Sequence, residues 1–197
     1  IVINSDDSIF EEIAKDAGVE FYLRPNHLGG SEIKSDNVVY DFIQKYPSSI
    51  VTWVNSVSPL QTAQEIKSAV NYFRDNCCDS LFTVENKLVH SCYEGRPLNF
   101  CVDEPFAKTQ DLTAVQNFVY SIMMWDTELF KKKMEQDGYA FFLGKVGYFP
   151  VSKESAILIK TKEDFLLAES IINSRLHAGP ELDYYSGKTY KEKLNVD

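Results

Sequence analysis

Apolar runs typical of strands alternate with apolar residues at helical spacing through the first half of the chain. The short apolar runs predict strands at residues 1–4, 21–23 and 50–54. Each run is followed by a stripe of apolar residues at helical spacing, which predicts helices over residues 9–17, 38–43 and 66–73. This alternation is typical of βαβ units. The chain is therefore predicted to be an α/β protein with a largely parallel sheet, in which the strand at 1–4 is buried.

Polar residues that cap helices mark several of the expected boundaries. The run Ser5-Asp6-Asp7 offers acceptors to the start of the first helix, which accounts for these paired acidic residues without a metal. Gly18 supplies the stop of that helix. Thr62 and Glu65 form a capping box directly after the strand at 50–54. A strand end, a turn and a helix start are adjacent there, and open α/β sheets bind ligands at such points.

The second half of the chain is richer in β-type runs. Residues 80–111 are predicted to form hairpins that project from the sheet and, with few helical partners to cover their apolar side chains, to support a homodimer. An apolar group at 123–125 is expected in a core or an interface. The further elements expected are a helix at 127–136, strands at 140–143, 147–151 and 156–159, and a last helix capped by residues 161–164. One domain would then span residues 1–178, with the β-rich insertion at 80–111 and a polar tail at 179–197.

Composition and charge describe a globular, acidic protein. The chain has 197 residues, of which 44% are hydrophobic, and its formal net charge is −9. No basic stripe is present to neutralise a nucleic-acid backbone, so no nucleic acid is expected as a partner, whereas a nucleotide needs only a few local donors. Without a membrane-spanning segment or a signal-peptide pattern, a cytoplasmic protein is expected. The four cysteines lack zinc-site or disulfide spacing and are predicted to be reduced packing residues.

Four short segments follow one another in an informative order. They read INSDD with IAKDAG at 3–7 and 13–18, LRPNHL at 23–28, SPLQT at 58–62, and IKTKEDFLLAE at 159–169. These segments are similar to V-S-T-D with I-A-x-x-x-G, L-R-P-x-x-L, S-P-L-R-T and I-D-T-E-E-D-F-E-L-A-E of the acylneuraminate (sialic acid) cytidylyltransferases. Because all four occur in the family's order and near its spacing, the chain resembles that family from residue 1 to residue 172.

The resemblance implies a Rossmann-like α/β fold of the nucleotide-diphospho-sugar transferase type, with a mixed, mainly parallel sheet and a β-rich dimerisation projection. The implied reaction transfers CMP from CTP to an acidic sugar, such as a sialic-acid-like nonulosonate, and releases pyrophosphate with the help of Mg2+. At the matched positions, Arg24 and Ser35 are implied to bind the nucleotide. Asn55, Lys108 and Gln110 are implied to bind the sugar substrate.

Departures from the family pattern bear on activity. Residues 158–160 read Leu-Ile-Lys where the family has D-I-D, and neither Leu158 nor Lys160 offers the oxygen ligand that Mg2+ requires. No metal ligand is therefore predicted, and the catalytic residues stay unknown. Asn55 is shorter than the family's Gln, and Gln61 replaces its Arg. The family's glycine-rich triphosphate loop lies ahead of the first matched segment. We expect it in residues that precede Ile1, the alternative being that the protein lacks it.

Two functions therefore stay open at this point. One is an active nucleotidyltransferase, and the other is a member that has lost catalysis and serves as a nucleotide-binding, sugar-binding or structural subunit. Single residues also keep a second interpretation: Arg24 as part of a surface salt bridge, Ser35 as a helix N-cap, and Lys160 as an exposed lysine at a strand end. The three histidines share no spacing typical of metal ligands or of a catalytic pair.

Overall fold

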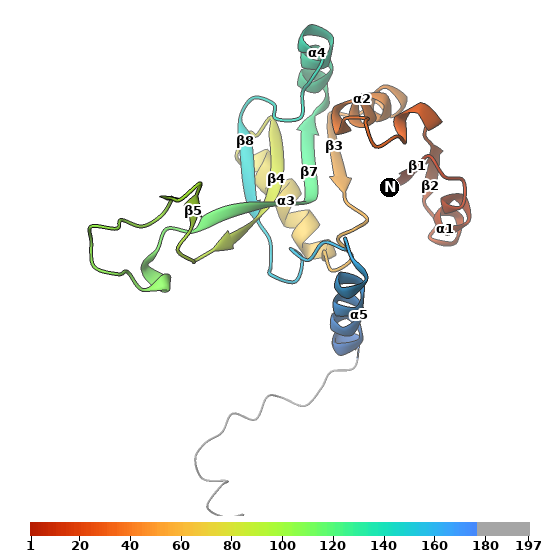
Figure 1. The fold of residues 1–197 in the computed structure, drawn as a ribbon. Helices are drawn as coiled ribbons and strands as arrows, with labels where there is room; N and C mark the ends of the chain where they lie inside the picture. The colour runs from red at the N-terminus through yellow and green to blue at the C-terminus, as the bar shows by residue number, and fades with distance from the viewer. Residues whose placement is uncertain (177–197) are drawn as a thin grey trace, which may run out of the picture. The chain divides into compact units, whose positions relative to one another are not determined.

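The structure, a computed structural model, describes residues 1–176 and divides the chain into two compact units, one ending at Leu158 and the other beginning at Ile159. The first unit contains the sheets and the helices that pack on them (Figure 1). The described part of the second unit contains helix α5 (Lys162–Leu176). His177 and the predicted tail at 179–197 lie outside the described residues. Within residues 1–176, no helix is both long and apolar enough to cross a membrane.

The chain begins with a small parallel sheet. Strand β1 (Val2–Ser5) pairs with β2 (Glu20–Leu23), and helix α1 (Phe10–Asp16) connects them. The prediction of a buried first strand is wrong, because β1 is only half-buried. Ile9 and Ile13, which the pattern assigns to a buried stripe, are exposed. A two-stranded sheet offers too little apolar surface to cover them.

The polar run ahead of α1 shapes the turn before the helix and does not cap the helix itself. The backbone N–H of Asp7 donates to Ser5 Oγ at 3.1 Å, and the N–H of Ile9 donates to Asp7 Oδ1 at 3.0 Å. The N-cap position of α1 is Ile9, which makes no side-chain cap. The predicted stop is confirmed, since Gly18 has a φ of +64° in the left-handed region that favours glycine.

A four-stranded sheet lies at the centre of the first unit. In spatial order its strands are β3 (Ile50–Val54), β7 (Val115–Asp126), β4 (Ser80–Lys87) and β8 (Val146–Pro150). β3, β4 and β8 run in one direction, whereas β7 runs antiparallel to both of its neighbours. The predicted mixed, mainly parallel sheet is therefore confirmed. The carboxyl ends of three strands meet at one edge, which is the usual ligand-binding edge of an α/β sheet.

The central strand β7 was not predicted, and two predicted strands are absent. The segments at 140–143 and 156–159 form no strand. At 140–143, side chains take the place of a partner strand: Asp36 Oδ1 accepts the N–H groups of Ala140 and Phe141 at 2.6 and 2.7 Å. The N–H of Leu143 donates to Ser80 Oγ at 3.3 Å. An apolar segment can thus be buried without a ladder when side chains satisfy its backbone.

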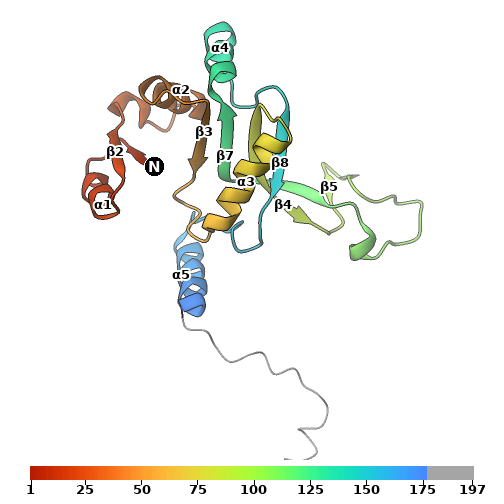
Figure 2. The same cartoon turned by 180° about the vertical axis from the view of Figure 1, so that it is seen from behind.

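Helices cover both faces of the sheet. α2 (Ser35–Lys45) and α4 (Thr127–Asp137) contribute side chains to the core on one face. α3 (Ala63–Asp75) packs on the other face, and Figure 2 shows it in front of the sheet. Adjacent residues of β7 point to opposite cores, with Trp125 facing α2 and α4 and Met124 facing α3. Both side chains are fully buried, so the apolar group at 123–125 belongs to the core.

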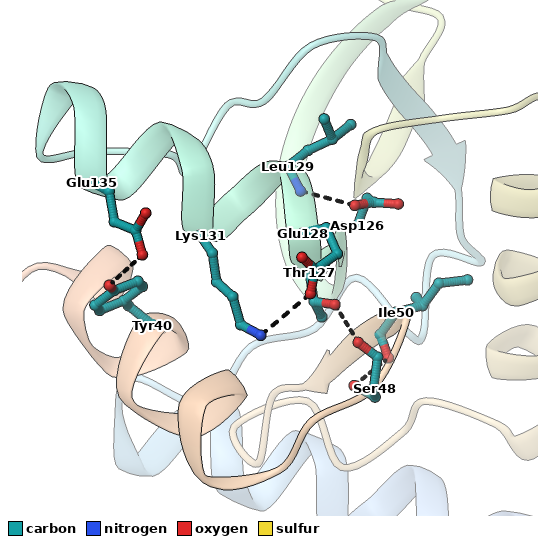
Figure 3. Close-up of polar contacts among 9 residues, drawn as sticks. All are labelled: Tyr40, Ser48, Ile50, Asp126, Thr127, Glu128, Leu129, Lys131 and Glu135. Carbon is teal, nitrogen blue, oxygen red and sulfur yellow. Dashed lines mark hydrogen bonds and ion pairs between the residues drawn. The ribbon is translucent and has the colours of Figure 1, made fainter.

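The amino end of β3 is held by polar contacts with the start of α4 (Figure 3). Thr127 Oγ1 donates to the carbonyl of Ser48, and the Asp126 carboxylate caps α4 by accepting the N–H of Leu129 at 3.0 Å. Farther along α4, Tyr40 of α2 donates to Glu135 at 3.2 Å.

Residues 88–114 form a projection between β4 and β7. It contains β5 (Cys92–Tyr93), β6 (Arg96–Pro97) and the short 3-10 helix η2 (Thr109–Asp111). Residues 80–87, predicted to project as hairpins, instead lie in the sheet as β4. Large apolar side chains are exposed on the projection: Leu88, Val89, Tyr93, Leu98, Val102 and Phe106.

The cysteines are free, as predicted, but only Cys78 is buried. Cys77, Cys92 and Cys101 are exposed, so the packing role predicted for them is wrong. Two of the exposed cysteines lie on the projection, outside both cores.

Candidate functional site

A large β-bulge in β7 lies near the carboxyl edge of the sheet. Phe82 of β4 pairs with Met123 and Val84 pairs with Phe118, so residues 119–122 of β7 lie opposite Thr83 alone. Within the bulge, Tyr120 has a φ of +57°. This left-handed conformation costs a residue with a side chain about 1–2 kcal/mol. Bulges and strained residues of this kind are concentrated near functional sites.

A chain of hydroxyl groups satisfies the backbone at the bulge and leads out of the sheet. Thr83 Oγ1 accepts the N–H of Ile122 at 3.0 Å and lies 3.0 Å from Ser121 Oγ. Ser121 Oγ then donates to Oε1 of Gln61 at 2.7 Å. Thr83 and Ser121 are both fully buried. Sequence reasoning missed both residues; the available signal was a small hydroxyl side chain among the apolar neighbours of each strand.

The loop between β3 and α3, residues 55–62, is hydrogen-bonded to this series of hydroxyl groups, the polar chain, which runs from Thr83 through Ser121 and Gln61 to Glu65. Asn55 is held by its backbone, because its N–H donates to the carbonyl of Ser121 at 2.9 Å. Its side chain accepts the N–H of Val57 at 3.3 Å. Ser58 is buried, and its Oγ makes no hydrogen bond with any described residue. A buried hydroxyl without a partner is costly, so Ser58 is a candidate contact for a ligand.

Glu65 joins this loop to the segment that follows β8. The predicted capping box is confirmed: Thr62 Oγ1 accepts the N–H of Glu65, and the Glu65 carboxylate accepts the N–H of Thr62. The same carboxylate accepts Nε2 of Gln61 at 2.8 Å, Oγ of Ser155 at 2.6 Å and the N–H of Ser152 at 3.0 Å. Sequence reasoning assigned Glu65 to the cap alone, because Ser152 and Ser155 lie far away along the chain.

These donors determine the charge state of Glu65. Burial by itself raises the pKa of the carboxyl group, but the hydrogen bonds from Ser155, Ser152 and Thr62 together outweigh burial and lower the pKa to about 2. Glu65 is therefore ionised at neutral pH, and its hydrogen-bond partners among the described residues are neutral donors.

Arg24 lies at the end of β2 and is already paired. Its Nη2 donates to Asp6 Oδ1 at 2.6 Å, so Asp6 is an ion-pair partner and not the helix cap that was predicted. The salt-bridge interpretation of Arg24 is thus met by a partly exposed pair, in which the Arg24 side chain is 15% exposed and that of Asp6 is 40% exposed. The Nε of Arg24 is buried without a described partner. A Cβ on Gly29, which follows the short 3-10 helix η1 (Asn26–Leu28), would lie 2.0 Å from Asp6 Oδ2, so a larger residue there would displace the Asp6 carboxylate from the pair.

The remaining predicted residues lie apart from the polar chain. Ser35 is the first residue of α2 and is exposed; the N-cap is Lys34, so the interpretation of Ser35 as the cap is wrong. Lys108 and Gln110 are exposed on the projection. Lys108 is the N-cap residue of η2, and Gln110 lies within η2. Within residues 1–176, Asn55 is the only one of the five predicted binding residues that is hydrogen-bonded to the polar chain.

A cavity of about 410 Å³ also lies on the projection, where His90 stacks on Phe106. It is lined by residues between His90 and Thr113 and includes none of the polar chain. Its wall combines aromatic rings with the carboxylates of Glu104 and Asp111. We assign the candidate site to the sheet edge, where buried polar groups converge, and not to this cavity.

The positions that match the family's metal ligands do not fit Mg2+. Leu158 has no ligand atom in its side chain, and Lys160 is a cation. The backbone N–H of Lys160 donates to Asp164 at 3.0 Å, as part of the predicted cap of α5. Among the described residues, no three His, Cys, Asp or Glu side chains are grouped as a metal site.

Comparison with solved structures finds proteins that share this fold. No family model matches the sequence. The chain superposes on 4-diphosphocytidyl-2C-methyl-D-erythritol synthase from Anaerococcus prevotii with a TM-score of 0.59 at 15% identity, covering 85% of this chain and 77% of that one. It superposes on CMP:2-keto-3-deoxy-manno-octonic acid synthetase complexed with CTP with a TM-score of 0.60 at 10% identity, covering 88% and 80%. This chain has the cytidylyltransferase-type α/β fold.

A third similar structure shows that this fold is not restricted to proteins named for cytidine. Molybdopterin-guanine dinucleotide biosynthesis protein A from Archaeoglobus fulgidus matches with a TM-score of 0.50 at 13% identity, covering 88% of this chain and 78% of that one. The fold by itself therefore identifies neither the base nor the acceptor, which must be argued from the site.

Two buried serines at the site should respond differently to truncation. Ser155→Ala removes a donor to Glu65, so we expect it to lower the free energy of unfolding by about 1–3 kcal/mol. Ser58→Ala removes a hydroxyl that has no described partner, so we expect stability to stay equal or rise by up to about 1 kcal/mol. Urea unfolding of both variants measures the difference. Equal losses would mean that Ser58 Oγ has a structural partner.

Glu65 should make the protein sensitive to acid in a defined range. Its folded pKa, about 2, lies below the ordinary value of 4.5, so its stabilising effect is present above pH 4.5 and is lost as the pH falls toward 2. We expect the unfolding free energy of the wild type to fall more steeply in this range than that of Glu65→Gln. The exposed Glu12→Gln is the matched control and should keep the wild-type slope. Parallel curves for all three proteins would contradict the assignment.

Proposed function

We propose that this protein binds CTP and transfers CMP to an acidic sugar of the nonulosonate type. The observation that carries the proposal is the polar cluster at the carboxyl edge of the sheet, which contains the buried and unpaired hydroxyl of Ser58. The similarity of the fold to a synthetase complexed with CTP supports the choice of nucleotide. The four motif segments support the choice of an acidic sugar.

In the proposed reaction, a hydroxyl oxygen of the sugar acid attacks the α-phosphorus of CTP. The bond from that phosphorus to the bridging oxygen of the β-phosphate breaks, pyrophosphate leaves, and the hydroxyl proton passes to solvent. Arg24 is the proposed nucleotide contact, since its Nε has no described partner and a guanidinium suits phosphate or ribose oxygens. Ser35 is proposed as a second nucleotide contact. Asn55 is proposed to hold the sugar acid, and so are Lys108 and Gln110, which lie on the projection and not on the polar chain.

A second candidate function follows from residues 158–160. Family members are expected to offset phosphate charge with a metal held at this place, and Leu158 and Lys160 do not fit that metal. The polar cluster is nevertheless well formed, with its network largely satisfied. These observations favour, as the alternative, a subunit that binds nucleotide or sugar with little or no turnover.

Release of pyrophosphate from CTP in the presence of eight- and nine-carbon sugar acids tests both candidates. We expect slow turnover by the wild type that is insensitive to EDTA. The double variant Leu158→Asp, Lys160→Asp should turn over faster and become sensitive to EDTA, because two carboxylates supply metal ligands. Binding of CTP without turnover by either protein would favour the binding subunit. Fast, EDTA-sensitive turnover by the wild type would mean that a metal is held elsewhere.

The proposed nucleotide contact has its own test. We expect Arg24→Ala to weaken CTP binding by about 1–3 kcal/mol, the range for loss of a charge-assisted hydrogen bond. Calorimetric titration measures this, and Arg74→Ala, which removes an exposed arginine of α3, serves as the control. Unchanged affinity in Arg24→Ala would remove Arg24 from the site.

We also propose a homodimer formed through the projection. Phe106 is 85% exposed and Val102 is 71% exposed, and such neighbouring apolar side chains favour a partner surface. Light scattering at micromolar concentration should give the dimer mass. Val102→Glu with Phe106→Glu should shift the mass toward the monomer, whereas Ile9→Glu, at an exposed position on another surface, should not. A wild-type monomer would contradict the proposal.

A further inference from the structure

We propose that Glu65 is a positioning residue of the candidate site, which holds the loop at 55–62 and the segment at 151–155 in the arrangement that binds the sugar acid. This inference rests on the proposed function for its ligand but not for its geometry. Glu65 is not proposed to touch the substrate. It would act through the two segments that its carboxylate joins.

The contacts of Glu65 exceed what a helix cap requires. A capping box needs one carboxylate oxygen to accept the N–H of Thr62, at 3.2 Å here. Besides the Thr62 hydroxyl, donors from three other residues converge on the same carboxylate: Gln61, Ser152 and Ser155. Two of them come from residues 87 and 90 positions away along the chain. Capping alone gives no reason for these contacts between segments.

The two carboxylate oxygens have different partners. Within residues 1–176, Oε1 accepts the N–H of Ser152 alone, whereas Oε2 accepts from Gln61, Thr62 and Ser155. Ser155 is fully buried, and its hydroxyl also accepts from Ser152 Oγ at 3.0 Å. The segment at 151–155, which follows β8, is therefore held to the Glu65 carboxylate by Ser152 and Ser155.

On its other side, the network reaches a residue proposed to bind the substrate. Gln61 has both ends of its amide engaged, with Nε2 donating to Glu65 and Oε1 accepting from Ser121. The carbonyl of Ser121 accepts the N–H of Asn55. A displacement of Glu65 is thus transmitted through Gln61 and Ser121 to Asn55. Ser58, with its unpaired hydroxyl, lies in the loop between Asn55 and Gln61.

The division of partners makes Glu65→Gln a selective variant. A glutamine can place its oxygen at the Oε2 position and keep the three partners there. Its NH2 group would then face the N–H of Ser152, and two donors cannot bond to each other. The variant should retain the cap of α3 while releasing Ser152. Ser155→Ala, which removes another link to the same segment, provides a second variant if Glu65→Gln does not fold.

The experiment titrates a nine-carbon sugar acid into protein saturated with CTP. For Glu65→Gln we expect affinity for the sugar acid to fall about tenfold while the Kd for CTP stays unchanged, because a displaced loop misplaces the group that holds the sugar. Asp126→Ala, which loses the cap of α4 at the other end of the sheet, is the control for a purely structural loss. It should lose stability and keep the sugar affinity. Equal losses of sugar affinity in both variants would overturn the inference.

Hydrogen exchange separates failure of this inference from failure of the proposed function. In Glu65→Gln, the amide of Ser152 and the amide of Asn55 should exchange faster than in the wild type, and in Asp126→Ala they should not. If the wild type binds no CTP but this exchange pattern is found, the proposed function fails and the positioning role of Glu65 stands. If exchange at Ser152 and Asn55 is unchanged in Glu65→Gln, the inference is wrong whatever the protein binds.

Discussion

The rest of the structure depends on one constraint, which is that the backbone at the bulge in β7 must find hydrogen-bond partners inside the protein. β7 is the antiparallel strand between β3 and β4, and its extra residues break the ladder where the sheet is fully buried. Thr83 restores the missing partners with its hydroxyl. Because that hydroxyl also engages Ser121, a polar network starts in the core and emerges at the carboxyl edge. The candidate site thus begins at the Thr83 hydroxyl, which satisfies the backbone of the bulge, and continues through Ser121 to Gln61.

The electrostatics of the site differ from those expected of a metal-dependent transferase. Glu65 is ionised, but its oxygens are occupied by neutral donors and are not open to a cation. Arg24 is partly neutralised by Asp6. The proposed nucleotide contact, Arg24, therefore offers only part of its positive charge to a ligand. This is consistent with either of the two functions considered, in which phosphates are bound by a few directed contacts.

Much of the local structure follows from the sequence. Strand β3, the capping box of α3 and the stop at Gly18 each depend on residues close together in the chain, and all three agree with the prediction. The cap of α5 by Asp164 agrees for the same reason. The mainly parallel sheet was also predicted, because the order of strands and helices restricts the possible topologies.

Other features were decided only by the tertiary structure. β7 was missed because its second half does not alternate in polarity: residues 121–125 are all buried. The site shows the same limit. The sequence identified Arg24, Asn55 and Glu65 as notable, but it did not reveal that Arg24 pairs with Asp6 or that Glu65 binds Ser152 and Ser155. Short-range patterns determine caps, turns and strand ends, whereas partners distant in sequence are chosen by packing, which brings together only those groups whose hydrogen bonds can be completed.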